Sequence, residues 1–472
     1  MNELREAPLQ VAAATVDLTP RAGLPLGGYL LREGKTATRA HDPLEGSLVW
    51  LRDRAEGEVL WIGMDALCAD EELAGLIATA VSRACGCRTD AVLVCASHTH
   101  SSAAGWVRGL GPMLPETADA GLRDGLVERL SSAARLLPGR LTPCWPVLAE
   151  GRAPAAGGNR NDPAGPHDAS VGVLAAVDAA GRIAGGVFDY ASHGTVLGYD
   201  NLEWSADWPG AARRSLSASL AELAPFEGPA SGEPSQEVPS ANGTPTVAFL
   251  QGAAGDASPR FVRRSQSFSE ADRLGGLVAG AALTAILEGV PEAAELRVTV
   301  RRASVGVQTR DLPDVAEARR RSNELEAAWL AARAAGVAAP QERIARTRYE
   351  GSLMLVALAE AGMPPTLDLP IAAVAVGDAA WVHLPVELFA SYGLALRERS
   401  PFPSTRVIGY TNGYMGYVAD EAAHRDGVYE ASASRFDPHG GQVLADAALD
   451  LLRALADEAS TESPRALQDA WR

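Results

Sequence analysis

Short apolar runs alternate with longer amphipathic stretches along almost all of this 472-residue chain, and this alternation constrains its fold most strongly. The apolar runs have the length of strands, and the longer stretches space their apolar residues as helices do, a pattern typical of α/β proteins. At this length the chain can bury a large core, as one domain or as two that pack closely together. The sequence therefore predicts mixed β-sheets flanked by helices.

The predicted elements can be placed along the chain by residue range. The segments that contain predicted strands are 44–53, 58–67, 90–101, 170–194, 246–260, 369–389 and 405–414. Within 170–194 an Ala-Ala-Gly turn predicts a hairpin. The predicted helices lie at 70–86, 121–137, 314–362 and 441–459. The helical segment 314–362, in which Ser322 has the sequence context of an N-cap, is expected to be a helical pair or insertion.

Two segments do not have the composition of packed structure. Residues 225–245 are rich in Pro, Ser, Gly and Glu and are expected to form a mobile surface loop. Residues 461–472 are expected to be a C-terminal tail, which leaves 1–460 for the folded domain. No repeat of solenoid or propeller length is found.

Charge and cysteine content exclude several classes of function. A net charge of −17 disfavours nucleic acid and anionic membranes as partners. No apolar run is long enough to cross a bilayer, and the charged N-terminal residues do not resemble a secretion signal. The five cysteines are an odd number and do not suggest a disulfide framework. Cys85 and Cys87 could form half of a metal site, but no second pair has matching spacing. A cytoplasmic protein is expected.

Histidines follow two of the predicted strands. His98 and His100 lie where an apolar strand enters a Ser/Gly loop, two residues apart, so both can face one pocket. His193 repeats this placement after the strand ending at Tyr190. Each histidine could be purely structural, but ligand sites gather at the carboxyl ends of strands, and imidazoles presented there often bind zinc. The pattern favours a metal or catalytic site.

Other polar residues are candidates for the same site. Glu387 follows an apolar strand and Pro385, where it could complete a set of two histidines and one carboxylate or simply favour a helix N-terminus. Asp256 and Ser258 lie in a Gly-rich loop that is not a G-x-S-x-G elbow, so Ser258 could be a nucleophile or a turn residue. Tyr414 and Tyr417 could pack in the core or cover a substrate.

Taken together, these segments resemble the neutral (non-lysosomal) ceramidase family, and they occur in the family's order. The matching segments are VAAATVDLTP with GGYLLR, HDPLEGSLVWL, SHTHSSAAG, GGNRNDPAGPHDASVGVL, ASHGTVLG, GDASP, LPVELF and NGYMGY. They span roughly residues 10 to 455. The resemblance implies the catalytic-domain fold of that family, without the C-terminal β-sandwich domain that its full-length enzymes carry.

The resemblance also implies a set of roles for individual residues. His98, His193, Glu387 and Tyr417 would surround one Zn²⁺ per chain, and either His98 or His100 could be the first ligand. His100, Arg160, Asp256 and Ser258 would take part in catalysis, and Tyr29 and Tyr414 would contact the substrate. The chain departs from the family pattern at Ser102-Ala103, Gly194 and Val386. These departures leave metal binding intact but leave the substrate open.

The expected activity is hydrolysis of an N-acyl amide, in a ceramide-like lipid or another small molecule. Zinc lowers the pKa of a bound water to about 7 and polarises a carbonyl, while His100 could protonate the leaving amine. A Ser258 acyl-enzyme is the rival mechanism. An esterase, a lactonase or an amidase of specialised metabolism could use the same zinc site, and a non-catalytic zinc-binding protein is the third alternative. The oligomeric state stays open.

Overall fold

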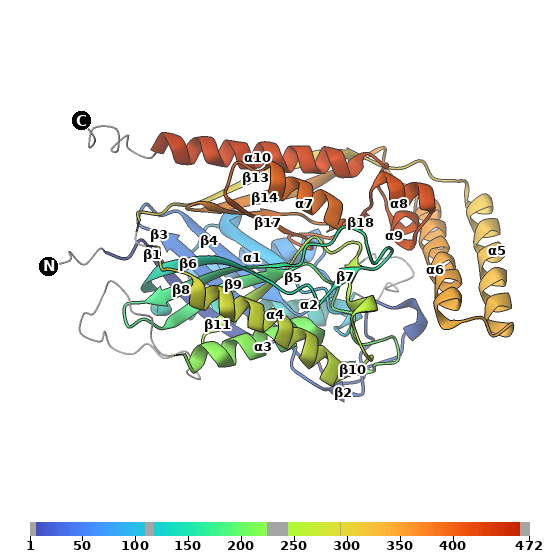
Figure 1. The fold of residues 1–472 in the computed structure, drawn as a ribbon, viewed down its shortest axis with the longest axis horizontal. Helices are drawn as coiled ribbons and strands as arrows, with labels where there is room; N and C mark the ends of the chain where they lie inside the picture. Colours follow the sequence, from blue (N-terminus) through green and yellow to red (C-terminus); the bar gives the residue numbers. More distant parts are fainter. Residues whose placement is uncertain (1–5, 109–117, 224–243, 293, 463–472) are drawn as a thin grey trace.

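The computed structural model describes residues 6–108, 118–223, 244–292 and 294–462 (Figure 1). Residues 225–243 of the predicted surface loop and 463–472 of the predicted tail lie outside these ranges. The predicted fold class is confirmed: two mixed β-sheets form the centre of the molecule and helices cover their outer faces (Figure 1).

The larger sheet has eight strands in the order β11-β9-β8-β6-β1-β3-β4-β5. Its strands are β1 (Leu9–Asp17), β3 (Glu45–Asp53), β4 (Glu58–Met64), β5 (Val92–Ala96), β6 (Thr142–Arg152), β8 (Ser170–Asp178), β9 (Ile183–Tyr190) and β11 (Thr246–Gln251). The pairs β4–β5 and β9–β11 are parallel, and the other pairs are antiparallel. The predicted hairpin is the pair β8–β9. Each parallel pair therefore lies at one edge of the sheet.

The larger sheet curls until its two edges approach each other. Gly63 in β4 lies under β11, where a Cβ atom would be only 2.8 Å from the carbonyl oxygen of Phe249. Gly185 in β9 likewise lies against Ala13 in β1. Such close packing needs residues with little or no side chain. Because of this curl, the carboxyl ends of β5 and β9 come together although five strands lie between them in the sheet order.

Helices cover the outer faces of this sheet. The side chains of β3 alternate between the two faces of the sheet. Leu48 and Trp50 face the core under α1 (Glu71–Cys85) and α2 (Ala120–Ala134), while Val49 faces the interior of the curl. On β8, β9 and β11 the outer face is covered by α3 (Asp207–Ala221) and α4 (Phe268–Glu288). The Asp70 carboxylate caps α1 by accepting a hydrogen bond from Leu73 N.

A second sheet closes the interior of the curl. Its order is β13-β14-β15-β17, from β13 (Val298–Gln308), β14 (Thr366–Val376), β15 (Ala379–His383) and β17 (Ser404–Ile408). Trp381 of β15 meets Trp61 of β4 edge to face, with 5.6 Å between ring centroids. The helices α7 (Ala390–Arg399) and α10 (Gly440–Glu462) pack on its other face (Figure 1). The molecule therefore has four layers: helices, the larger sheet, the second sheet and further helices.

The predicted helical segment 314–362 forms a hairpin of α5 (Val315–Ala334) and α6 (Ala339–Ala361), which stands at one end of the molecule (Figure 1). Ser322 does not cap a helix: α5 begins earlier, at Asp314, whose carboxylate accepts from Glu317 N. Ser322 is buried and bonds Ser352 of α6. The base of the hairpin meets the short helix α9 (Tyr429–Ala433), where Gly351 lies against Ser432.

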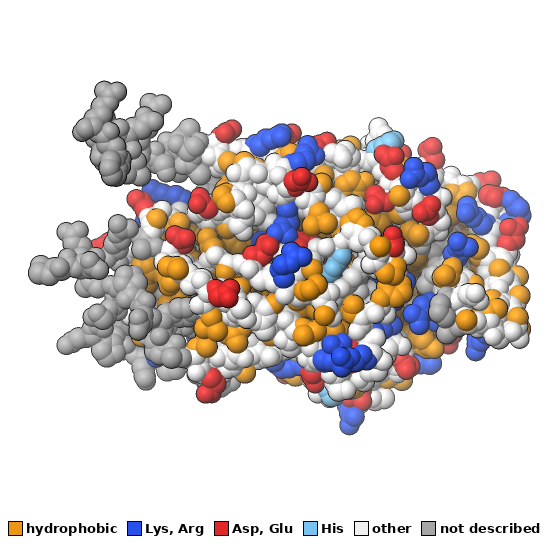
Figure 2. All heavy atoms as spheres, viewed as in Figure 1, with side chains coloured by type: hydrophobic (Ala, Val, Ile, Leu, Met, Phe, Trp, Pro, Cys, Tyr) orange, Lys and Arg blue, Asp and Glu red, His pale blue; other side chains and the backbone are white. Residues whose placement is uncertain are grey.

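Charged side chains of both signs are interspersed over the face drawn in Figure 2, without the broad basic surface that nucleic acid requires. None of the helices that the structure describes is long and apolar enough to cross a membrane.

Candidate active site

The candidate site lies where the two sheets meet, at the carboxyl ends of several strands. Backbone contacts join the segments that leave these strands. Thr99, after β5, pairs with Gly194, after β9, and Gly252, after β11, pairs with Ile408 at the end of β17. The residues that follow these strands are therefore held in fixed positions relative to one another.

His98 has a ring whose orientation is fixed by the backbone around it. The residue has a left-handed conformation with φ 60°, which is uncommon outside glycine. Its main-chain N–H donates to Ala66 O, and its Nδ1 lies 2.6 Å from Leu67 O. Since a carbonyl can only accept, Nδ1 carries the proton and the lone pair belongs to Nε2. That Nε2 lies 3.3 Å from Nε2 of His100.

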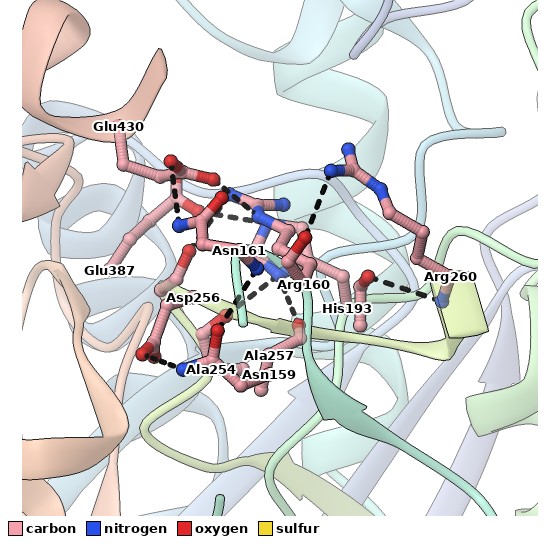
Figure 3. Close-up of polar contacts among 12 residues, drawn as sticks. Asn159, Arg160, Asn161, His193, Ala254, Asp256, Ala257, Arg260, Glu387 and Glu430 are labelled. Atoms are coloured by element: carbon pink, nitrogen blue, oxygen red, sulfur yellow. Dashed lines mark hydrogen bonds and ion pairs between the residues drawn. The ribbon is translucent and has the colours of Figure 1, made fainter. Parts of the chain in front are cut away.

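His193 is held in the same way from the other side of the site (Figure 3). Its Nδ1 lies 2.8 Å from Ala254 O and 3.0 Å from Ala257 O, so Nε2 again has the lone pair. Nε2 has no hydrogen-bond partner among the described residues, although it lies 3.1 Å from Oε2 of Glu387. Burial lowers the pKa of His193 to about 4, which keeps the imidazole neutral at pH 7.

Glu387 supplies the carboxylate between these rings. It begins the two-residue strand β16 (Glu387–Leu388), which pairs in parallel with β18 (Tyr417–Val418). Its Oε2 lies 3.4 Å from His98 Nε2 and accepts from the Tyr410 hydroxyl at 3.2 Å, while the Tyr414 hydroxyl donates to Oε1. Burial alone would raise the pKa of Glu387, but His98 and His193 outweigh it and hold the pKa well below its usual range.

These donor atoms have the spacing of a metal-ligand set. The ligand atoms of His98, His100 and His193 all lie within 4.8 Å of one another, and all three residues are buried. Oε2 of Glu387 lies 3.1 Å from Nε2 of His193 and 3.4 Å from Nε2 of His98, and the Nε2 atoms of His98 and His100 are 3.3 Å apart. Two ligand atoms bound tetrahedrally to zinc, each at about 2.1 Å, are about 3.4 Å apart, so these separations are close to those of a zinc site. An unpartnered lone pair at His193 Nε2 and a buried carboxylate next to it suit a cation. The residues present therefore fit Zn²⁺.

The tyrosines contact this set in different ways. Tyr417 lies opposite Glu387 in the β16–β18 pair, and its ring is parallel to that of His193 at 6.5 Å between centroids. Tyr414 and Tyr410 are the two that hydrogen-bond Glu387. Tyr410 was not predicted as a site residue, although it lies two residues before the NGYMGY segment. Tyr29 is placed against His100, with 4.8 Å between ring centroids, and donates to Leu197 O.

Arg160 reaches the site from the loop after β7 (Gly158–Asn159). Its guanidinium carbon lies 5.5 Å from the centroid of the Tyr417 ring, and Nη2 donates to Gly255 O. Its Nε donates to Oε1 of buried Glu430 at 2.5 Å, and Asn161 donates to the other oxygen (Figure 3). Glu430, in α9, therefore orients Arg160. Its sequence context is that of an ordinary short helix and did not single it out.

Asp256 and Ser258 have structural contacts. The Asp256 carboxylate accepts from Asn159 Nδ2 and from Ala390 N, at the start of α7. Burial raises the pKa of Asp256 to about 6. Ser258 Oγ accepts from Arg260 N and so caps the short turn Pro259–Phe261. Within the described residues no histidine or carboxylate hydrogen-bonds Ser258, as a serine nucleophile would require.

His100 is the remaining histidine of the site. Its Nδ1 is buried without a hydrogen-bond partner among the described residues. Burial, with repulsion from His98 and His193, lowers its pKa well below the usual value. The structure thus brings every predicted site residue to one region, with Tyr410 and Glu430 added.

Gly255 tests how tightly this region is packed. A Cβ atom there would lie 2.4 Å from the carbonyl oxygen of Glu387, a backbone atom that cannot move without displacing the carboxylate. We expect Gly255→Ala to lower kcat/KM by about tenfold or more, since small displacements of catalytic groups have large effects. Gly276→Ala, on the exposed side of α4 with nothing within 4 Å, is the matched control and should leave activity unchanged. Equal activity in both variants would contradict this account of the site.

Comparison with known proteins supports the fold. No known family model matches the sequence, and no curated protein matches it. Solved structures do match, among them one described as ceramidase complexed with C2, with a TM-score of 0.72 and 17% identity, and neutral ceramidase from Pseudomonas aeruginosa, with a TM-score of 0.71 and 18% identity. Both matches cover 96% of this chain, and they cover 76% and 75% of those chains. The predicted ceramidase-like fold is therefore confirmed.

Proposed function

We propose that this chain is a zinc-dependent hydrolase that cleaves an N-acyl amide bond in a lipid or another small molecule. The observation that carries the proposal is the buried convergence of His98, His193 and Glu387, in which the two Nε2 atoms lie 3.4 and 3.1 Å from Oε2 of Glu387. This set lies at strand ends in a fold shared with two ceramidase structures. A buried carboxylate facing two imidazole lone pairs has little structural use without a cation between them.

His98, His193 and Glu387 would hold one zinc ion, with His100 or Tyr417 as the further ligand. A bound zinc ion supplies a Lewis acid and activates water for attack. In the reaction the water oxygen bonds the acyl carbon, the C–N bond breaks, and the water protons end on the amine and the acid. If Tyr417 is that further ligand, buried His100 keeps its lone pair and can accept a proton from the water and pass it to the amine. Arg160, oriented by Glu430, is positioned to donate hydrogen bonds to the oxyanion.

The Ser258 acyl-enzyme mechanism receives less support. Oγ of Ser258 is engaged as a helix-turn cap, and no base contacts it within the described residues. We therefore assign Ser258 and Asp256 to the support of the loop that holds His193 through Ala254 O and Ala257 O. Hydrolysis of an ester or lactone would use the same groups, because only the leaving atom differs. The cytoplasmic location and a role in sphingolipid metabolism stay predictions.

The first test combines metal analysis with activity. We expect the purified protein to contain about one zinc per chain and to release fatty acid from a fluorescent ceramide or another N-acyl amine. A chelator should abolish this activity, and added Zn²⁺ should restore it. Zinc without amide or ester hydrolysis would favour the non-catalytic alternative. Failure to retain or take up zinc would refute the proposed mechanism.

A further inference from the structure

We propose that the amide substrate carries an acidic group, a carboxylate or a phosphate, and that Arg260, Arg263 and Arg343 bind it beside the zinc site. This inference deepens the proposed function and rests on it. In an N-acylated amine with an apolar acyl chain, the amine half is the end that can carry such a group. The three arginines would then select amines by charge.

The three arginines have no counterion within the described residues. Arg260 donates through Nη1 to Arg160 O, and Arg263 donates through Nη1 to Thr195 O and Val196 O. These acceptors are neutral carbonyls, and each arginine uses only one of its three nitrogens. The side chain of Arg343, in α6, forms no hydrogen bond or ion pair with any described residue. Such unpaired cations are unexpected in a chain with 59 acidic and 42 basic residues.

Nearby carboxylates are already engaged elsewhere. Glu430 is bound by Arg160 and Asn161, and Glu350 of α6 lies 3.5 Å from Arg346. The Asp207 carboxylate accepts from the main-chain N–H groups of Val196, Leu197 and Trp208. None of them lies within ion-pair distance of Arg260, Arg263 or Arg343. An anion from outside the chain would supply the missing charge.

Arg260 and Arg263 contact the segments that carry catalytic groups. Arg260 follows Ser258 by two residues, at the end of the loop whose carbonyls fix His193, and extends beside the main chain of Arg160 (Figure 3). Arg263 holds the segment just after His193 through Thr195. Both Arg263 and Arg160 act electrostatically on Tyr29, whose ring contacts His100. An anion among the arginines would therefore lie next to the groups that handle the amide.

Electrostatics supports the same reading. Burial, followed by repulsion from Arg160, lowers the pKa of Arg260 to about 10, and Arg343 and Arg263 add to that repulsion. Burial also lowers the pKa of Arg263, with a further contribution from Arg343. The arginines are thus partly desolvated and repel one another, although Glu430 attracts Arg260 and Asp207 attracts Arg263. Because a guanidinium binds carboxylate or phosphate through two parallel hydrogen bonds, an acidic substrate would offset this repulsion specifically.

The test compares three amides that share a dodecanoyl chain. Their amine halves are ethanolamine, which is neutral, glycine, which is a carboxylate, and phosphoethanolamine, which is a phosphate. We expect the zinc-loaded full chain to hydrolyse at least one acidic amide with a kcat/KM about tenfold or more above that of the neutral one. The preferred acid identifies the group that the arginines bind.

Variants then assign the preference to the arginines. Arg260→Gln and Arg263→Gln should each reduce the acidic-to-neutral ratio of kcat/KM by about tenfold, mainly through KM. Arg263→Lys keeps the positive charge but loses the planar guanidinium that can donate two parallel hydrogen bonds, so it should give an intermediate ratio. Arg264→Gln and Arg348→Gln remove equal charges from exposed side chains and should not change the ratio.

Each outcome bears on one of the two proposals. Equal hydrolysis of all three amides, or a ratio that the controls change as much as Arg260→Gln does, would overturn the arginine site and leave the amidase proposal standing. If no amide is hydrolysed, binding of dodecanoylglycine is measured by calorimetry. Binding that Arg260→Gln weakens would retain the anion site while the amidase proposal fails, and absent binding would overturn both.

Discussion

Replacing Glu387 with glutamine should abolish zinc retention and lower amide hydrolysis by about a thousandfold or more. The substitution preserves shape but removes the one carboxylate that, among the described residues, faces both His98 Nε2 and His193 Nε2. Loss of groups that merely orient a ligand weakens metal binding by about 10- to 100-fold, so loss of the anionic ligand itself should weaken it further. Zinc content per chain and kcat/KM measure the two effects.

A matched control separates this effect from general damage. Glu398→Gln removes a carboxylate from the exposed side of α7, eleven residues later, and should change neither zinc content nor activity. The Glu387→Gln protein should remain folded, because a buried charge is replaced by a neutral amide that Tyr410 can still contact. Full zinc occupancy in folded Glu387→Gln protein would show that Glu387 is not a ligand.

Replacing Arg406 with methionine should cost about 3–5 kcal/mol of the free energy of unfolding. Arg406 is 4% exposed and lies in β17, yet it binds both oxygens of Asp189 in β9 and the hydroxyl of Ser170 in β8. This contact joins the two sheets. In the variant, Asp189 would stay buried, at 2% exposure, without its cation. Denaturant unfolding monitored by circular dichroism measures the cost.

The cost should also depend on pH. Burial outweighs the attraction of Arg406 and raises the pKa of Asp189 even in the native protein. Removing Arg406 raises it further, so the folded variant binds a proton more tightly than the unfolded chain does. Its stability therefore falls as pH rises through that pKa, and the loss relative to the native protein should be larger at about pH 8 than at about pH 5.

Two comparisons make this prediction specific. Arg399→Met breaks an exposed pair with Asp446 in the same part of the molecule and should cost about 1 kcal/mol or less. The double variant Arg406→Met/Asp189→Leu should recover much of the loss, since no unpaired charge remains. If Arg406→Met costs no more than Arg399→Met, the buried pair does not stabilise the junction of the sheets.

The elements that sequence periodicity predicted are those with clear local patterns. The apolar runs of β3 and β4 and the acidic first turn of α1 were enough to predict these elements. The strands β6 and β13 did not, because Pro143 and Pro146 interrupt the first and charged or small residues fill the second. The helix α4 was missed since its glycines weaken the helical signal, although they allow Gly275 to pack directly on α3.

The site was predicted through residue types at strand ends, supported by resemblance to a family. What the sequence could not supply was the curl of the sheet that brings β5 to β9, because it depends on contacts between residues far apart in the chain, such as Gly63 and Phe249. Tyr410 was missed for a related reason. Its contact with Glu387 depends on a left-handed backbone at φ 53°, which no local pattern reveals.

The α5–α6 hairpin divides the chain between the groups proposed to hold the metal. His98 and His193 precede the hairpin and Glu387 follows it, while its connection near Gly336 is exposed. A chain opened at that connection would give two fragments, each with an incomplete set of donors and each with one helix of a complementary pair. Zinc-dependent turnover would then report their reassembly, so this scaffold has the layout of a split enzyme that senses proximity.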